Sequence, residues 1–185
     1  MKRWRCTVCG YVHEGKSPPD KCPQCGADMN RFVLAEPLDP ELEDMVRAAF
    51  AGEAKATARN QAFARRARAE GLPQVAALFK AVAEAERVHA AELLPYLEGE
   101  VGSSEQNLQA AFEHELAAKS EHYPPIIAAA IQAKRPDLEW ALVRARDVEA
   151  RHAELYKRAL SALAAEREVT YHVSVSYTHL TLPTN

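Results

Sequence analysis

The sequence has little excess charge of either sign, because 23 Lys and Arg residues stand against 26 Asp and Glu residues, for a net charge of −3. It has no apolar run approaching the roughly 20 residues of a membrane-spanning helix. The first ten residues, MKRWRCTVCG, lack the apolar segment of a signal peptide. These absences argue against a basic nucleic-acid-binding surface and against a membrane protein. We expect a cytoplasmic protein with neither nucleic acid nor membrane among its partners.

Cysteine is absent beyond position 25, and the four cysteines before it form two Cys-x-x-Cys pairs 12 residues apart: Cys6, Cys9, Cys22 and Cys25. Four thiolates at this spacing suit one tetrahedral ion, either Fe or Zn. Residues 1–35 are too few for a self-sufficient apolar core, so a metal would supply folding energy. Two disulfides are the alternative, but no secretory context favours them. The spacing therefore predicts a small metal-binding β module over residues 1–35 and does not separate iron from zinc.

A second domain is predicted over residues 41–167, which are rich in Ala, Leu, Glu, Arg and Gln. Proline and glycine divide it into four helices. The first covers residues 40–70, the second 73–94 and the fourth 136–166, and the third begins at Ser103 or Ser104. The third helix meets Pro124 and Pro125 midway and must kink or be interrupted there. Four long helices with short connections predict an antiparallel four-helix bundle.

Each half of this predicted bundle carries the same pattern of potential metal ligands. Glu86 and His89 form one Glu-x-x-His pair, and Glu149 and His152 form another 63 residues later. A further glutamate, Glu53 or Glu115, precedes each pair by 33 or 34 residues. Residues at i and i+3 share one helix face. Taken singly, each residue reads as solvated surface. Taken together, they match the ligand set of ferritin-like di-iron or di-manganese bundles.

The strings WRCTVCGYVHEG and PDKCPQCGADMNRF, with aromatics at Trp4, Tyr11 and Phe32, resemble rubredoxin. The strings AEAERVHAAEL and VEARHAELY, joined to such a module, resemble the rubrerythrin family, in which the module usually follows the bundle. The resemblance implies a di-iron peroxidase, active in oxidative stress, that reduces hydrogen peroxide to water. It also implies electron transport through a thiolate-bound iron, a reduced donor such as rubredoxin or an NAD(P)H-dependent reductase, and a homodimer. The implied catalytic residues are the six bundle ligands and Tyr123 of the EHYP string.

Two positions depart from the usual family pattern. Ala118 stands where rubrerythrins usually carry a further glutamate, and Asn60 stands where they usually carry a tyrosine. Without that glutamate we expect a simpler site of four glutamates and two histidines. Two other functions therefore stay open: iron binding or storage beside a structural zinc ribbon, and a di-iron oxidase that consumes O₂.

The last segment, residues 168–185, differs from the rest of the chain. No Asp, Glu, Lys or Arg occurs from Val169 to Asn185. Rubrerythrins often leave the last helix through a string like TYHV and enter a Cys-x-x-Cys module, but here SVSYTHLTLPTN follows. We interpret residues 174–185 as resembling translated sequencing-adapter read-through. On this interpretation the tail is artefactual and the natural chain would continue into a second rubredoxin-like module.

Overall fold

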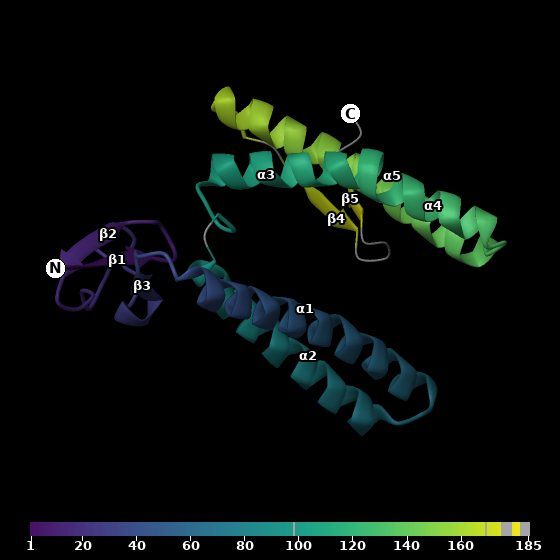
Figure 1. Cartoon of the computed structure of the whole chain (residues 1–185), viewed down its shortest axis with the longest axis horizontal. Helices are drawn as coiled ribbons and strands as arrows, with labels where there is room; N and C mark the ends of the chain where they lie inside the picture. Colours follow the sequence, from purple (N-terminus) through teal and green to yellow (C-terminus); the bar gives the residue numbers. More distant parts are fainter. Residues whose placement is uncertain (98, 169, 175–178, 182–185) are drawn as a thin grey trace. The chain divides into compact units, whose positions relative to one another are not determined.

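The computed structural model describes residues 1–97, 99–168, 170–174 and 179–181. The chain divides into two compact units, Met1–Val101 and Gly102–Asn185. The first unit holds the cysteine module and one helical hairpin, and the second holds another hairpin and a two-stranded sheet (Figure 1). The predicted class, a helical protein preceded by a small β module, is confirmed.

The cysteine module is built on a three-stranded antiparallel sheet. Strand β1 (Lys2–Cys6) lies between β2 (Val12–Gly15) and β3 (Phe32–Leu34), and a 3₁₀ turn, η1 (Met29–Arg31), precedes β3. The core consists of Cys6, Cys22 and Phe32, with Trp4, Cys9, Tyr11 and Ala27 packed against them. Cysteine thus makes up much of the core, which agrees with a fold that depends on a bound ion.

The first hairpin consists of helices α1 (Pro40–Ala69) and α2 (Pro73–Leu93). Helix α1 begins where Asp39 accepts a hydrogen bond from the backbone N–H of Leu42 at 3.1 Å, with proline in the first turn. The buried residues of this hairpin are all alanines: Ala64 and Ala67 on α1, and Ala76, Ala83 and Ala90 on α2. Because alanine is small, the two helices approach closely and leave larger apolar side chains on the outside. Leu78 of α2, for example, is 61% exposed within this unit.

The last residues of the first unit form a segment that follows α2 directly. A 3₁₀ turn, η2 (Leu94–Tyr96), continues α2, and Leu97 after it is only 3% exposed. The guanidinium of Arg5 donates a hydrogen bond to the carbonyl oxygen of Pro95 at 2.7 Å. Arg47 forms an ion pair with Glu100. This segment is therefore held against both the cysteine module and α1.

The second unit contains helices α3 (Ser104–Ala117), α4 (Tyr123–Gln132) and α5 (Pro136–Ala164). The predicted N-terminal cap of the third helix is confirmed, because Ser103 and Gln106 form a reciprocal capping box. Helices α3 and α4 are separated by one π-helical segment, η3 (Ala118–His122), and α5 folds back along both (Figure 1).

The predicted interruption of the third helix is confirmed, and its form is a π-helical turn. The backbone N–H of Tyr123 donates to the carbonyl oxygen of Ala118, five residues earlier. Pro124 and Pro125 cannot donate to their i−4 carbonyls, so the helix widens just before them.

Two short strands, β4 (His172–Ser174) and β5 (His179–Thr181), pair antiparallel after α5. The interpretation of residues 174–185 falls largely on positions 175–178 and 182–185, outside the described residues. Within the described part of the chain, no helix combines the length and the apolar character needed to cross a bilayer.

Candidate metal centres

The four cysteines converge on one point in the small module. The Sγ atoms of Cys6 and Cys25 lie 3.8 Å apart, and those of Cys9 and Cys22 lie 3.6 Å apart. Four thiolates at about 2.3 Å from a tetrahedral ion would be separated by about 3.8 Å. A disulfide needs sulfurs about 2 Å apart, and all four cysteines are free. The geometry therefore fits one tetrahedral ion and excludes the two-disulfide alternative.

The chain around the cysteines turns through Gly10 and Gly26, with φ of 79° and 75°, which favours glycine. Burial would raise the pKa of the Cys22 thiol, but the backbone amides of Cys25 and Gln24 outweigh it and lower that pKa to about 7. The amide of Ala27 lowers the pKa of Cys25, yet burial and the three neighbouring thiols outweigh it and raise the pKa to about 12. Four sulfurs this close cannot all ionise without a cation between them.

The first hairpin brings together Glu53 of α1 with Glu86 and His89 of α2. One ligand atom from each lies within 4.8 Å of the others. The Nδ1 atom of His89 lies 3.0 Å from Oε2 of Glu86 and 3.9 Å from Oε2 of Glu53. This cluster, which we call half-site 1, has one imidazole and two carboxylates.

The second hairpin repeats the arrangement with Glu115 of α3 and with Glu149 and His152 of α5, which we call half-site 2. Its ligand atoms also lie within 4.8 Å of one another. The Nδ1 atom of His152 lies 2.9 Å from Oε2 of Glu149 and 3.4 Å from Oε1 of Glu115. Half-site 2 is the less exposed one: Glu115 is 15% exposed against 33% for Glu53, and His152 is 27% exposed against 56% for His89.

Both half-sites carry carboxylates that repel each other. The neighbouring Glu86 carboxylate, followed by burial, raises the pKa of Glu53. Burial, followed by the Glu149 carboxylate, raises the pKa of Glu115. In each case the histidine acts in the opposite direction and more weakly. A divalent cation would relieve this repulsion, and carboxylate and imidazole donors suit iron.

Ten of the predicted ligand side chains lie in three clusters, namely the four cysteines, half-site 1 and half-site 2. That these side chains bind metal stays a prediction. No further cluster of three such side chains occurs in the described residues. Tyr123 is half-buried at the first position of α4, so its link to the metals stays a prediction. Asn60, at the position where the family usually carries a tyrosine, donates a hydrogen bond from its side-chain amide to the carbonyl oxygen of Ala56 at 3.0 Å.

The feature that the sequence reasoning did not foresee is the π-helical turn itself. It begins at Ala118, three residues after Glu115, and Ala118 is buried. The paired prolines were its signal, because two successive residues that cannot donate force the helix to redistribute its hydrogen bonds. π-Helical turns are frequent at functional sites.

The fold and these clusters define a non-haem metalloprotein that joins a four-cysteine module to two helical hairpins with carboxylate and histidine ligands. The family model described as "Rubrerythrin, rubredoxin-like domain" matches residues 4–33, and the model "Rubrerythrin" matches residues 44–160. The chain therefore belongs to the rubrerythrin family, and its helices are of the ferritin-like kind. Its potential donor groups, four thiolates in one module and Glu and His groups in the helices, are consistent with iron.

The chain is also similar to individual relatives. Reverse rubrerythrin-1 of Clostridium acetobutylicum is 35% identical over 135 residues, which cover 64% of this chain and 75% of the relative. Nigerythrin of Nitratidesulfovibrio vulgaris is 32% identical over 141 residues, covering 69% and 70%. A solved structure of fully reduced, all-ferrous nigerythrin aligns over 77% of each chain at 29% identity, with a TM-score of 0.43.

Proposed function

We propose that this protein is a cytoplasmic di-iron peroxidase. Half-site 1 and half-site 2 together would hold two irons, and the four-cysteine module would hold a third that passes electrons to them. Each turnover reduces one hydrogen peroxide to two waters and consumes two electrons and two protons. The observation that supports this proposal best is the presence, in one chain, of a thiolate site and two matched carboxylate–histidine half-sites.

The residues of the half-sites divide the work by their chemistry. Four carboxylates offset the charge of two cations, and His89 and His152 add neutral nitrogen donors. Bound iron would supply the electrons for breaking the O–O bond. Glu53 and Glu115, each on the first helix of its hairpin, would supply further carboxylate ligands, and Tyr123 would donate a hydrogen bond to a ligand carboxylate.

The four-cysteine module serves as the entry point for electrons in this proposal. Cys25 is exposed while Cys6 and Cys22 are buried, so one edge of the site is open to a donor. We propose a reduced rubredoxin or an NAD(P)H-dependent reductase as that donor.

The decisive experiment combines metal analysis with rapid kinetics on anaerobically purified protein. We expect three irons per chain and the red colour of an oxidised iron–thiolate site. The fully reduced protein should be reoxidised faster by hydrogen peroxide than by O₂ in stopped-flow measurements. If hydrogen peroxide reoxidised the reduced protein no faster than O₂ does, the proposed activity would be that of an oxidase instead of a peroxidase. A colourless zinc-loaded module, with iron accumulating beyond two per pair of half-sites, would indicate storage instead.

A further inference from the structure

A cavity of about 670 Å³ opens within the first unit, between the sheet of the cysteine module and the segment that follows α2. We propose that it binds flavin mononucleotide, whose reduced form passes electrons one at a time to the iron held by the four cysteines. This inference rests on the electron-entry role proposed above for the module and adds a small-molecule donor with its own binding site.

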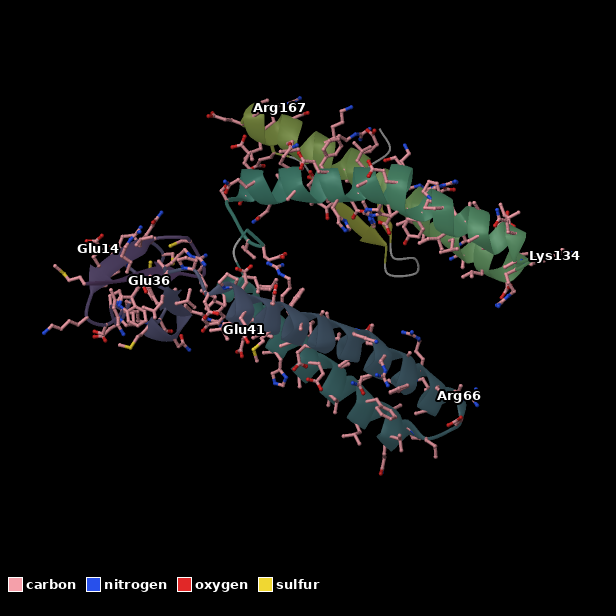
Figure 2. The ribbon with its side chains drawn as sticks, viewed as in Figure 1. Glu14, Glu36, Glu41, Arg66, Lys134 and Arg167 are labelled. Carbon is pink, nitrogen blue, oxygen red and sulfur yellow. The ribbon has the colours of Figure 1, made fainter. Side chains whose placement is uncertain are left out.

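The lining of the cavity belongs entirely to one compact unit. It comes from the three strands of the module, from the segment that leads into α1, and from the residues that follow α2. The hydrogen bond from Arg5 to the carbonyl oxygen of Pro95 joins the sheet to the residues after α2. Figure 2 labels Glu36 in the segment that leads into α1, and Glu41 at the start of that helix. The volume lies in the range of about 300–1,000 Å³ that small-molecule sites occupy.

Two arginines of β1 give the cavity an excess of positive charge. Arg3 and Arg5 both line it and stand two positions apart, so they share one face of the sheet. Neither forms an ion pair with a carboxylate of the described residues. In the described part of the lining, the exposed Glu36 supplies the one carboxylate. The cavity therefore favours an anionic ligand.

A phosphate group fits this pair of guanidinium groups. Arginine presents five N–H donors in a planar fork that matches the oxygens of a phosphate. Arg5 uses Nη2 to bind the carbonyl oxygen of Pro95 and keeps the donors of Nε and Nη1. The side chain of Arg3 is exposed at the same cavity. Hydrogen bonds from both arginines to one phosphate would be charge-assisted, which makes them stronger than those between neutral groups.

The rest of the lining suits a flat aromatic ring. Val33 and Leu97 line the cavity with apolar side chains and are themselves buried. Tyr96 also lines the cavity and is 48% exposed, so part of its ring is free to contact a ligand. Aromatic rings favour offset stacking or edge-to-face contact with a second ring. A ligand that combines a flat ring with a phosphate therefore matches both parts of the lining.

The cavity also lies next to the thiolate site. Arg5 directly precedes Cys6, and consecutive Cα atoms are about 3.8 Å apart. Trp4 and Phe32 line the cavity and also belong to the core that contains Cys6 and Cys22. The same two aromatic side chains therefore contact both the cavity and the cysteines, which gives electrons a short path from a bound ring to the thiolate iron.

The electron count of the acceptor favours a flavin over a nicotinamide. A single thiolate-bound iron accepts one electron, whereas a nicotinamide releases two together as hydride. A reduced flavin can release its two electrons separately. In the first step Fe³⁺ becomes Fe²⁺, and the flavin loses one electron and one proton. After the iron has passed this electron on, the second step repeats the transfer and leaves oxidised flavin. The two electrons and two protons released are those that convert one hydrogen peroxide to two waters.

Binding is tested by titrating oxidised flavin mononucleotide with the purified full-length protein and following the quenching of flavin fluorescence. We expect saturation at one flavin per chain. Riboflavin has the same ring without the phosphate and should bind at least about 10-fold more weakly, because the contacts with the arginines are lost. The absence of saturable binding would overturn the site. Riboflavin that binds as tightly as the mononucleotide would overturn the role of the arginines.

Three variants locate the site. Arg3→Glu should weaken binding of the mononucleotide at least about 10-fold and leave riboflavin binding unchanged. Tyr96→Ala should weaken the binding of both ligands, because the ring contact is lost. Arg31→Glu is the matched control, since Arg31 is an exposed arginine of the same module outside the cavity lining. Equal losses in Arg3→Glu and Arg31→Glu would refute the site. Circular dichroism and the metal content of the module verify that each variant folds.

The donor role is tested anaerobically by mixing oxidised protein with reduced flavin mononucleotide and following the loss of the red colour by stopped flow. We expect the rate to saturate with flavin concentration and, at low flavin, to be at least about 10-fold lower in Arg3→Glu. Dithionite should reduce both proteins at the same rate. Equal rates with flavin would refute the donor role.

The failure of this inference is distinguishable from that of the proposed function. A protein that flavin reduces through the cavity, but that peroxide reoxidises no faster than O₂, would refute the peroxidase alone. A colourless zinc-loaded module would refute the electron relay and with it the donor role, while the fluorescence titration would still decide whether the cavity binds flavin.

Discussion

The Nδ1 atom of His152 lies 2.9 Å from Oε2 of Glu149, one helical turn earlier on α5. The corresponding distance between His89 and Glu86 on α2 is 3.0 Å. Two consecutive hairpins therefore present the same pair in the same geometry. An i, i+3 pair on a helix can converge without help from the rest of the fold, so each Glu-x-x-His pair is formed locally, whereas Glu53 and Glu115 reach their pairs only across the hairpins.

Replacing one ligand of half-site 2 should remove bundle metal. We expect Glu149→Ala to weaken bundle metal binding by more than about 100-fold, since even groups that merely support a ligand contribute 10–100-fold. Metal content after dialysis measures this. Glu154→Ala, on an exposed position of the same helix, is the matched control and should keep full occupancy. Unchanged metal in Glu149→Ala would show that the site lies elsewhere.

Removing one thiolate should separate electron entry from bundle metal. Cys9→Ser should abolish the red colour and bring donor-driven peroxide turnover near background, because a serine hydroxyl is a poor ligand for this ion. The bundle should retain its metal, as measured by elemental analysis. Val8→Ser places the same side chain at a 62% exposed neighbouring position and should retain both colour and turnover. Undiminished turnover in Cys9→Ser would refute the relay.

The contribution of Glu115 to the stability of the metal-free protein should decrease as pH rises. The pKa of Glu115 is raised from its usual 4.5 by burial and by Glu149, so the folded chain holds a proton that the unfolded chain releases at lower pH. Stability is then greatest below about pH 4.5 as far as this group is concerned, and it falls as pH rises through the raised pKa. Glu115→Gln should flatten this dependence.

Thermal unfolding of chelator-treated protein between pH 4 and 7 measures this effect. Added Fe²⁺ should reverse the trend in the wild type, because the cation stabilises the ionised carboxylates. Identical pH dependence of the melting temperature in the metal-free wild type and in Glu115→Gln would contradict the assignment.

Two glycines should respond to alanine in opposite directions. Gly26 has φ of 75°, so Gly26→Ala should destabilise the cysteine module by about 1–2 kcal/mol and accelerate loss of its metal to a chelator. Gly52 lies inside α1 with open space around its Cβ position, so Gly52→Ala should stabilise the first hairpin by about 0.5–1 kcal/mol. Chelator kinetics and thermal unfolding distinguish the two effects, and equal signs would contradict the argument.

Much of the fold was predictable because its signals are local. The start of α1 at Pro40, the cap at Ser103 and the start of α5 at Pro136 follow from capping and proline chemistry within a few residues. The four cysteines and the two Glu-x-x-His pairs are likewise recognisable from spacing. The form of the break after Ala117 was not, because paired prolines exclude an ordinary α-helical turn without selecting what replaces it.

The ligand types, their repeat and the positions of the helices follow from the sequence alone, because these depend on neighbours within one or two turns. The folded chain was needed to show that the four sulfurs lie at distances suited to one ion and that Glu53 and Glu115 converge on their partner pairs across each hairpin. It also decided that alanines, rather than Leu78, fill the contact between α1 and α2. How closely two helices pack depends on how the side chains of both surfaces fit together. The sequence pattern of one helix describes only one of these two surfaces.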